Sequence, residues 1–290
     1  MENQKTVAAI HDISGFGKCS LTVALPILSA AGIGVSVLPT AVLSTHTGGF
    51  TGYTYRDLTE DMLPFANHWK SLDLKFDALY SGFLGSFEQI AIVSDIFDLF
   101  KTKNNLILVD PVMADNGKLY PTYTSQMAGG MVKLCKKADI IVPNLTEAAF
   151  MLGEEFYDGP YERSYIEGLL VRLSKFGPKQ VVLTGVWFSP ELLGCAGYNR
   201  ENGKFSYAFS PRVQGFFHGT GDVFASTLLA GLLNGMDLDK AMQTAVDFTY
   251  GSIVRTKESG TDPRFGVNFE AGLPQLIQQL GLVAQPESSR

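Results

Sequence analysis

The sequence predicts an α/β protein in which helices cover both faces of a mostly parallel central sheet, forming three α/β/α layers. Short apolar, β-branched runs recur along the chain and alternate with longer amphipathic stretches. The short runs are apolar on both faces, as strands in the interior of a parallel sheet are. This alternation is typical of a doubly wound fold, in which crossovers are right-handed and ligands bind at the carboxyl ends of the strands.

The short apolar runs predict the individual strands, and the amphipathic stretches predict the helices. Strands are expected at Thr6–Ile10, Val35–Pro39, Ala78–Ser81, Leu106–Asp110, Ile140–Pro143 and Val181–Thr184. Helices are expected at Gln89–Lys101, Ser125–Lys136, Tyr161–Lys175, Asp222–Leu233 and Leu238–Lys257. The turn signal Asn202-Gly203 predicts a hairpin that pairs Gly194–Asn199 with Lys204–Ser210. We expect one domain over residues 1–283 and a polar tail at 284–290.

Composition and charge narrow the class of protein. Apolar residues make up 46% and charged residues 18%, which suits a folded core. With 23 basic and 29 acidic side chains and no basic cluster, no nucleic-acid partner is expected. No apolar run approaches the roughly 20 residues that span a bilayer, so no membrane partner is expected either. The three scattered cysteines and the polar start MENQKTVAAI predict a cytoplasmic location.

The most informative segment is the turn Gly219-Thr220-Gly221-Asp222, where an apolar approach leads directly into a helical pattern. Such a turn aims unpaired N–H groups and the positive end of the helix dipole at one point, which favours an anion there. Phosphoryl transfer needs this kind of charge stabilisation, and Asp222 is placed to accept a proton from an attacking hydroxyl. The structural alternative is an ordinary N-cap, with Thr220 or Asp222 capping the helix.

Further carboxylates follow two of the predicted strands. Asp110 and Asp115 come after one strand, and Asn144 and Glu147 follow the next. Mg²⁺ prefers oxygen ligands, commonly one or two carboxylates with waters and substrate phosphate, so Asp110, Asp115 and Glu147 are candidate metal ligands. Taken singly, Asp110 could be a strand-end turn former and Glu147 a first-turn helix charge.

The segment Gly15-Phe16-Gly17-Lys18-Cys19 superficially suggests a nucleotide-binding P-loop. A P-loop would need glycine at Asp12 and Ser or Thr at Cys19, so the motif is not met, and two glycines also fall short of a dinucleotide fingerprint. We expect an acceptor-site loop that leads into a helix. Cys19 is expected to be a packing residue, unless exposure next to Lys18 activates its thiol.

In order and spacing, the motifs Asp110-Pro111-Val112-Met113-Ala114-Asp115, Pro143-Asn144-Leu145-Thr146-Glu147 and Gly219-Thr220-Gly221-Asp222 resemble the ribokinase superfamily. Together with Ser44-Thr45-His46-Thr47-Gly48 and Gly117-Lys118-Leu119-Tyr120, they resemble its pyridoxal/pyridoxine (vitamin B6) kinases. The resemblance runs from about Val7 to Gly281. It implies phosphorylation of the 5′-hydroxymethyl group of a B6 vitamer by ATP with Mg²⁺, and often a homodimer. A monovalent cation such as K⁺ is left open.

The resemblance also assigns roles to individual residues. Asp222 would be the catalytic base, with the amides of Gly219, Thr220 and Gly221 as the anion hole. Asp115 and Glu147 would act near Mg²⁺, with Asp110 in support. The nucleotide would contact Asn144, Thr184, Tyr120, Val213 and Phe217, and the acceptor would contact Thr47.

Departures from the family pattern lie at the acceptor end. Asp12 stands where many members have a serine that binds the pyridine ring, Phe83 replaces a tyrosine, and His218 precedes the glycine turn. Asp12 could bind the ring's 3-hydroxyl or protonated nitrogen, or it could cap the following helix. His218 could contact the acceptor or be a buried polar group with satisfied hydrogen bonds, and His46 has the same two readings. The rival functions are a hydroxymethylpyrimidine (phosphate) kinase and a catalytically silent binding protein on the same fold.

Overall fold

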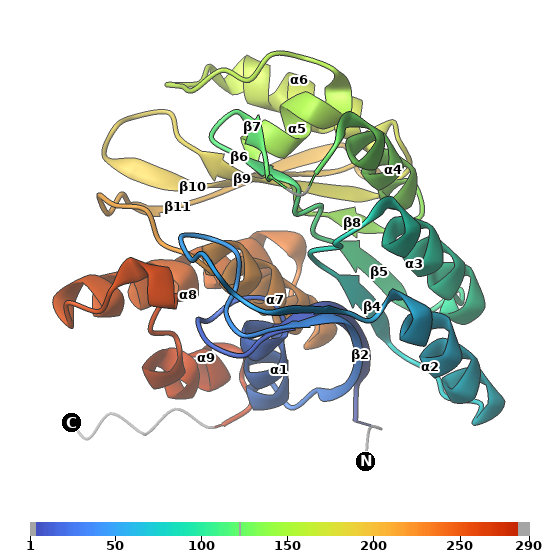
Figure 1. The fold of residues 1–290 in the computed structure, drawn as a ribbon. Coiled ribbons are helices and arrows are strands. Elements are labelled where there is room, and N and C mark those ends of the chain that lie inside the picture. The colour runs from blue at the N-terminus through green and yellow to red at the C-terminus, as the bar shows by residue number, and fades with distance from the viewer. Residues whose placement is uncertain (1–3, 122, 284–290) are drawn as a thin grey trace.

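The computed structural model describes residues 4–121 and 123–283, and its main feature is one large sheet. The sheet order is β11-β10-β9-β8-β5-β4-β1-β2-β3 (Figure 1). The six strands from β2 to β9 in this order are parallel, whereas β3 at one edge and β10 and β11 at the other are antiparallel. The strands are β1 (Thr6–Ser14), β2 (Gly34–Leu43), β3 (Tyr55–Asp57), β4 (Ala78–Ser81), β5 (Leu106–Val109), β8 (Ile140–Ile141), β9 (Gln180–Val186), β10 (Leu192–Asn199) and β11 (Lys204–Pro211).

Helices cover both faces of this sheet (Figure 1). One face carries α2 (Thr59–Ser71), α3 (Phe87–Phe100), α4 (Ser125–Cys135), α5 (Leu145–Leu152) and α6 (Arg163–Ser174). The other carries α1 (Leu21–Ala30), α7 (Thr220–Leu233), α8 (Leu238–Glu258) and α9 (Leu273–Gln279). Short 3₁₀ helices, η1 (Pro263–Phe265) and η2 (Glu270–Gly272), connect α8 to α9. A separate small hairpin joins β6 (Ala114–Asp115) and β7 (Lys118–Leu119). The predicted fold class is confirmed.

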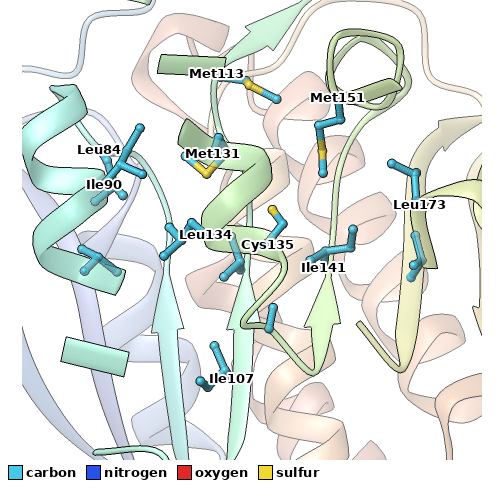
Figure 2. Packing of buried hydrophobic residues seen from close by; sticks show 14 of the residues in the cluster. Leu84, Ile90, Ile107, Met113, Met131, Leu134, Cys135, Ile141, Met151 and Leu173 are labelled. Atoms are coloured by element: carbon cyan, nitrogen blue, oxygen red, sulfur yellow. The ribbon is translucent and has the colours of Figure 1, made fainter. Parts of the chain in front are cut away.

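Each face of the sheet has its own hydrophobic core. Figure 2 shows part of the core under α3, α4 and α5, which includes Ile107 and Ile141 of the sheet and Met131 and Leu134 of α4. The opposite core packs α7 and α8 against residues such as Tyr80. Alternate residues of one strand enter different cores, as the two-residue strand period requires: Leu79 belongs to the first and Tyr80 to the second.

The predicted strands, hairpin and five helices are all present, with shifted ends. Strand β8 stops at Ile141, two residues early, since Pro143 has no backbone N–H to continue the ladder. Helix α6 begins at Arg163, because the preceding residue, Glu162, has an extended backbone (φ −75°, ψ 140°). The predictions give no range for α1, α2, α5 and α9, nor for the short strands β3, β6 and β7. Residues 284–290, the predicted tail, lie outside the described residues.

The fold leaves the carboxyl ends of the parallel strands on one edge, next to the N-terminus of α7. At this end β1 and β2 slip in register, with His11 opposite Pro39 but Ile13 opposite Val42, so Asp12 lies beside a β-bulge. Bulges of this kind commonly redirect side chains next to active sites. Within residues 4–121 and 123–283, no helix combines the length and the apolar character that crossing a bilayer would require.

Candidate active site

A single cavity of about 1050 Å³ runs along the carboxyl edge of the sheet. It extends from the loop after β2, past the N-terminus of α7, to the strands β10 and β11. Every site residue predicted from the sequence lines it: Asp12, Thr47, Phe83, Asp110, Asp115, Tyr120, Asn144, Glu147, Thr184, Val213, Phe217, His218, Gly219, Thr220, Gly221 and Asp222. The structure thus brings together residues that lie up to 210 positions apart, from Asp12 to Asp222.

The turn before α7 opens onto the middle of the cavity. Gly219 is the N-cap and adopts a left-handed conformation (φ 77°), and no side chain caps the helix. A Cβ at this position would lie 2.1 Å from the Lys18 carbonyl oxygen, so only glycine fits. The Thr220 hydroxyl donates instead to the Phe217 carbonyl at 3.3 Å. The alternative that Thr220 or Asp222 caps the helix is therefore wrong, and the first-turn amides remain available for a ligand.

Asp222 lies in the first turn of α7 and faces this cavity. Burial raises the pKa of its carboxyl to about 7, and negative charge on Asp12 adds to the rise, whereas a backbone hydrogen bond from Ser20 opposes it. A carboxylate with a pKa near neutrality is well matched to taking up and releasing a proton at physiological pH.

Asp110 lies directly opposite the glycine turn. A Cβ built on Gly221 would be 4.0 Å from its Oδ2 atom. Among the described residues, the Asp110 side chain has no hydrogen-bond partner, although it is only 7% exposed. Burial holds its pKa well above the usual range, and the nearby charges of Glu147 and Asp222 raise it further. A buried carboxylate in this state suits a site that gains a cation when its ligand binds.

Glu147 is predicted to be a metal ligand, but in the structure both its carboxylate oxygens accept hydrogen bonds from backbone amides. Its Oε1 accepts the Met113 amide at 3.0 Å, and its Oε2 accepts the Asn144 amide at 2.8 Å. Asn144 completes the capping box, since its Oδ1 accepts the Glu147 amide at 2.9 Å. Burial nevertheless raises the pKa of Glu147 to about 8, against three backbone hydrogen bonds that lower it. The reading of Glu147 as a first-turn helix residue is confirmed.

The three predicted metal residues do not form a compact ligand cluster. Over residues 4–121 and 123–283, no group of three His, Cys, Asp or Glu side chains is close enough to hold a metal ion. Asp115 lies on β6, and its Oδ1 accepts the adjacent Asn116 amide at 2.8 Å. Burial raises the pKa of Asp115 as well. Of these three residues, Asp110 and Asp115 therefore offer oxygens toward the cavity without disrupting a helix cap.

The acceptor end contains an unusual buried carboxylate. Asp12 is 4% exposed, and its Oδ2 accepts the Ser14 hydroxyl at 3.1 Å. Its Oδ1 has no partner among the described residues. Asp12 does not cap α1, because the N-cap of that helix is Ser20 and no side chain caps it. An unpartnered buried carboxylate oxygen that lines a cavity needs a donor, which a bound ligand or a water can supply.

The two histidines at this end differ. His46 is buried, and both its nitrogens have partners: Nε2 lies 2.7 Å from the Arg264 carbonyl and Nδ1 accepts the Gly48 amide at 3.1 Å. His46 is thus a satisfied buried polar group. Neither ring nitrogen of His218 has a hydrogen-bond partner in the described part of the chain, and its ring centroid lies 5.1 Å from that of His46. Burial lowers the pKa of both rings.

Other cavity residues were not predicted. Four of them form one face of α8 at helical spacing: Val246, Thr249, Tyr250 and Ile253. Their periodicity is visible in the sequence, but it indicates only a face and not what the face covers. Cys19 also lines the cavity, and burial, with the charges of Asp222 and Asp12, raises its pKa well above the usual range. The thiol is therefore not activated.

Comparison with known proteins places the chain among small-molecule kinases. Residues 28–265 match the model of a family described as phosphomethylpyrimidine kinase. A Bacteroides thetaiotaomicron protein, provisionally named phosphomethylpyrimidine kinase and crystallised with pyridoxal, is 38% identical, with a TM-score of 0.90 and 99% of each chain covered. Pyridoxal kinase from Lactobacillus plantarum is 29% identical, with a TM-score of 0.88, and 98% of this chain and 100% of that chain are covered.

A curated relative agrees with these structures. A provisionally named pyridoxal kinase of Schizosaccharomyces pombe is 28% identical over 218 residues, which is 72% of this chain. The match spans 62% of that relative, less than two thirds of its length.

Proposed function

Because this chain belongs to the phosphomethylpyrimidine kinase family, we propose that it transfers the γ-phosphoryl group of ATP to the 5′-hydroxymethyl group of a vitamin B6 vitamer. The observation that carries the proposal is the position of Asp222, in the middle of the cavity, beside the glycine turn and with a pKa raised to about 7. The relatives named pyridoxal kinase and the related structure with pyridoxal support the choice of acceptor.

In the proposed mechanism, the acceptor hydroxyl lies between Asp222 and the γ-phosphorus of ATP. Asp222 takes the hydroxyl proton as the oxygen attacks, and the bond from phosphorus to the leaving ADP oxygen breaks. The amides of Gly219, Thr220 and Gly221 face the transferred group and stabilise its negative charge. These amides are fixed by the helix before the reaction begins, so little reorganisation is needed when charge develops.

The nucleotide would occupy the end of the cavity near β9–β11 and α8. Asn144, which follows β8 and caps α5, lies there beside Thr184 of β9, and an isolated parallel bridge joins the two residues. Val213 and Phe217 offer apolar contacts, and Tyr120 lines the same cavity near the carboxylates. Mg²⁺ would supply positive charge between the phosphates and would be held by Asp110 and Asp115, since Glu147 is committed to its helix cap.

A hydroxymethylpyrimidine kinase is the second candidate. Asp12 fits it equally well, because its unpartnered Oδ1 could accept an aminopyrimidine N–H as readily as a pyridine hydroxyl or protonated nitrogen. A catalytically silent binding protein is less consistent with the site, since a pure binder needs no proton acceptor beside an anion site. Assembly as a homodimer stays a prediction, which sedimentation of the purified protein would test.

The decisive experiment measures ATP consumption by the purified protein with pyridoxal, pyridoxine, pyridoxamine, hydroxymethylpyrimidine or ribose as acceptor. At least one B6 vitamer should stimulate turnover above the rate without acceptor, and the product should be its 5′-phosphate. If only hydroxymethylpyrimidine reacts, the second candidate replaces the first. If no acceptor stimulates turnover, the kinase assignment to this acceptor class fails.

A further inference from the structure

Three consecutive backbone carbonyls of η1 each accept a hydrogen bond from a different loop at the acceptor end of the cavity. The Phe265 carbonyl accepts the Lys18 amide at 3.0 Å, and the Pro263 carbonyl accepts the His218 amide at 3.4 Å. The carbonyl between them, that of Arg264, lies 2.7 Å from Nε2 of His46. The loops 15–20, 44–54 and 212–219 are thus joined through one short segment.

The partners of His46 fix its protonation. A carbonyl can only accept and an amide N–H can only donate, so Nε2 carries the proton toward Arg264 and Nδ1 accepts from Gly48. His46 is therefore neutral in this arrangement and joins the loop that carries Thr47 to η1. Gly17 makes room for the ring, because a Cβ there would lie 2.3 Å from the His46 ring.

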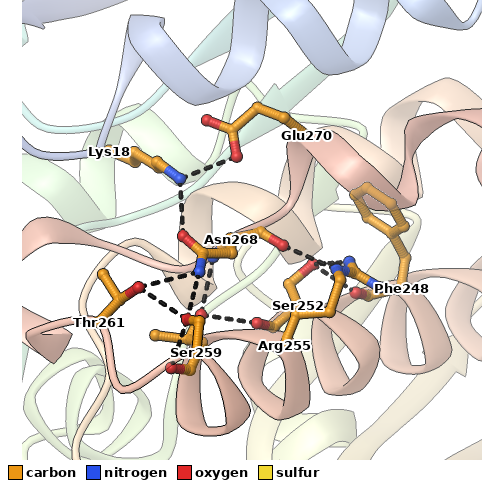
Figure 3. A network of polar contacts seen from close by, with 9 residues as sticks. Lys18, Phe248, Ser252, Arg255, Ser259, Thr261, Asn268 and Glu270 are labelled. Atoms are coloured by element: carbon orange, nitrogen blue, oxygen red, sulfur yellow. Dashed lines mark hydrogen bonds and ion pairs between the residues drawn. The ribbon is translucent and has the colours of Figure 1, made fainter.

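The side chain of Lys18 also contacts the chain after α8, in addition to the hydrogen bond that its backbone amide donates to Phe265 (Figure 3). Its ammonium donates to Asn268 Oδ1 at 3.0 Å and to Glu270 Oε2 at 2.8 Å. Asn268 is in turn fixed to the C-terminal end of α8, where its amide donates to the Thr256 hydroxyl at 2.7 Å and its Nδ2 donates to the Ser259 hydroxyl at 2.9 Å. The chain after α8 is thereby tied both to its own helix and to the loop after β1.

The backbone of Lys18 also lies against the glycine turn. Its carbonyl oxygen would be 2.1 Å from a Cβ at Gly219, and its Cβ would be 2.6 Å from a Cβ at Gly266. A displacement of Lys18 would therefore displace the turn whose amides face the cavity. Lys18 itself does not line the cavity, because its ammonium points away toward Glu270.

We propose that Lys18 and His46 are positioning residues that, through residues 263–270, hold the acceptor end of the cavity in register with the Gly219 turn. Their role is to place the acceptor hydroxyl at Asp222 without touching the reacting atoms. The proposal rests on the proposed function, since it concerns the placement of that acceptor. It also explains why the P-loop-like lysine lies outside the cavity lining: its ammonium is held by Asn268 and Glu270.

The test compares Lys18→Met with Lys5→Met. Lys5 forms an ion pair of 3.3 Å with Asp77 and lies outside the cavity lining. The control variant Lys5→Met therefore loses a partially exposed ion pair, as Lys18→Met does. Such pairs contribute little to stability, so both variants should fold. Because small displacements of reacting groups are costly, Lys18→Met should raise the acceptor KM by about fivefold or more, with the ATP KM within about twofold. Lys5→Met should change neither.

A second pair of variants separates the two hydrogen bonds of His46. His46→Gln can keep a donor for the Arg264 carbonyl, whereas His46→Ala keeps neither contact. The acceptor KM should rise in His46→Ala and recover at least partly in His46→Gln. An equal loss in both variants, or an acceptor KM in Lys18→Met that matches Lys5→Met, would overturn the proposal.

Amide hydrogen exchange tests the positioning role of Lys18 without any measurement of catalytic activity. In Lys18→Met, residues 44–54 and 215–221 should exchange faster than in Lys5→Met. If the unmodified protein phosphorylates none of the acceptors, the proposed function has failed, and exchange alone then decides on the positioning network. Identical exchange in the two lysine variants would refute the network whatever the activity.

Discussion

Glu147 and Met113 are joined by a hydrogen bond of 3.0 Å in which the Met113 amide donates to Oε1 of Glu147. This bond fixes the segment after β5, which carries Asp110 and Asp115, to the first turn of α5. Glu147, which the sequence suggests is a metal ligand, thus shapes the site by holding the backbone of the segment that carries Asp110 and Asp115. Substitution of Glu147 is therefore expected to affect the stability of the protein.

Glu147→Gln should destabilise the protein. A glutamine amide can accept only one of the two backbone N–H groups that Glu147 now accepts, so one buried donor loses its partner. An unsatisfied buried donor costs about 1–3 kcal/mol, to be measured as a free energy of unfolding in urea. Glu88→Gln, in the exposed first turn of α3, is the matched control and should be nearly neutral. Equal stability of the two variants would contradict the capping role.

Gly219→Ala and Gly221→Ala should differ sharply although they lie two residues apart. At Gly219 both the positive φ of 77° and the contact with Lys18 exclude a side chain, so the alanine variant should be poorly folded or inactive. At Gly221 the added Cβ meets only Asp110 Oδ2, at 4.0 Å, so the fold should persist. Because that Cβ would occupy space proposed for the phosphoryl group, kcat should nevertheless fall by about tenfold or more. Thermal unfolding and steady-state kinetics measure the two effects. Parental turnover in Gly221→Ala would place the phosphoryl group elsewhere.

Asp110→Asn should weaken Mg²⁺ binding and leave the fold intact. Since Asp110 has no hydrogen-bond partner among the described residues, its replacement breaks no internal bond and removes a charge that burial disfavours. The Mg²⁺ concentration that gives half-maximal turnover should rise by about tenfold or more, as expected on loss of one carboxylate ligand. EDTA should abolish turnover of the unmodified protein. An unchanged Mg²⁺ dependence, or activity that survives chelation, would exclude this metal site.

Activity should depend on pH through Asp222. A general base works when deprotonated, and burial raises its pKa to about 7, so kcat/KM should fall as pH drops below about 7 and level off above it. The negative charge on Asp12 contributes to the raised pKa, so Asp12→Asn should move this limb to lower pH. Initial rates between pH 5.5 and 8.5 measure both profiles. A flat profile over that range would contradict Asp222 as the titrating base.

The sequence was sufficient for the fold and for the neighbourhood of the site because both follow from local patterns. Apolar runs locate the parallel strands, and the carboxyl ends of adjacent strands must share an edge, which brings Asp110 and Asn144 together. The Gly219–Asp222 turn and the helical pattern that follows it predict the start of α7. The spacing of Asn144 and Glu147 is also that of a capping box, so the residues that suggest a metal site equally predict a helix start.

The remaining features depend on contacts that local patterns do not encode. The partner of His46 is a backbone carbonyl 218 positions away, and a carbonyl has no sequence signature. The face of α8 that lines the cavity is periodic, but only the packed structure shows that it borders a cavity. The β-bulge beside Asp12 arises from pairing between two strands, which neither strand's sequence specifies alone.

The most direct test of the central claim is the turnover of Asp222→Asn under saturating ATP and acceptor. The asparagine preserves the shape of the side chain but cannot take the acceptor's proton, so kcat should fall by about 10²–10⁴-fold. ATP binding, measured by calorimetry on the same sample, should stay close to that of the unmodified protein. Turnover near the parental value in a variant that binds ATP normally would show that Asp222 is not the catalytic base.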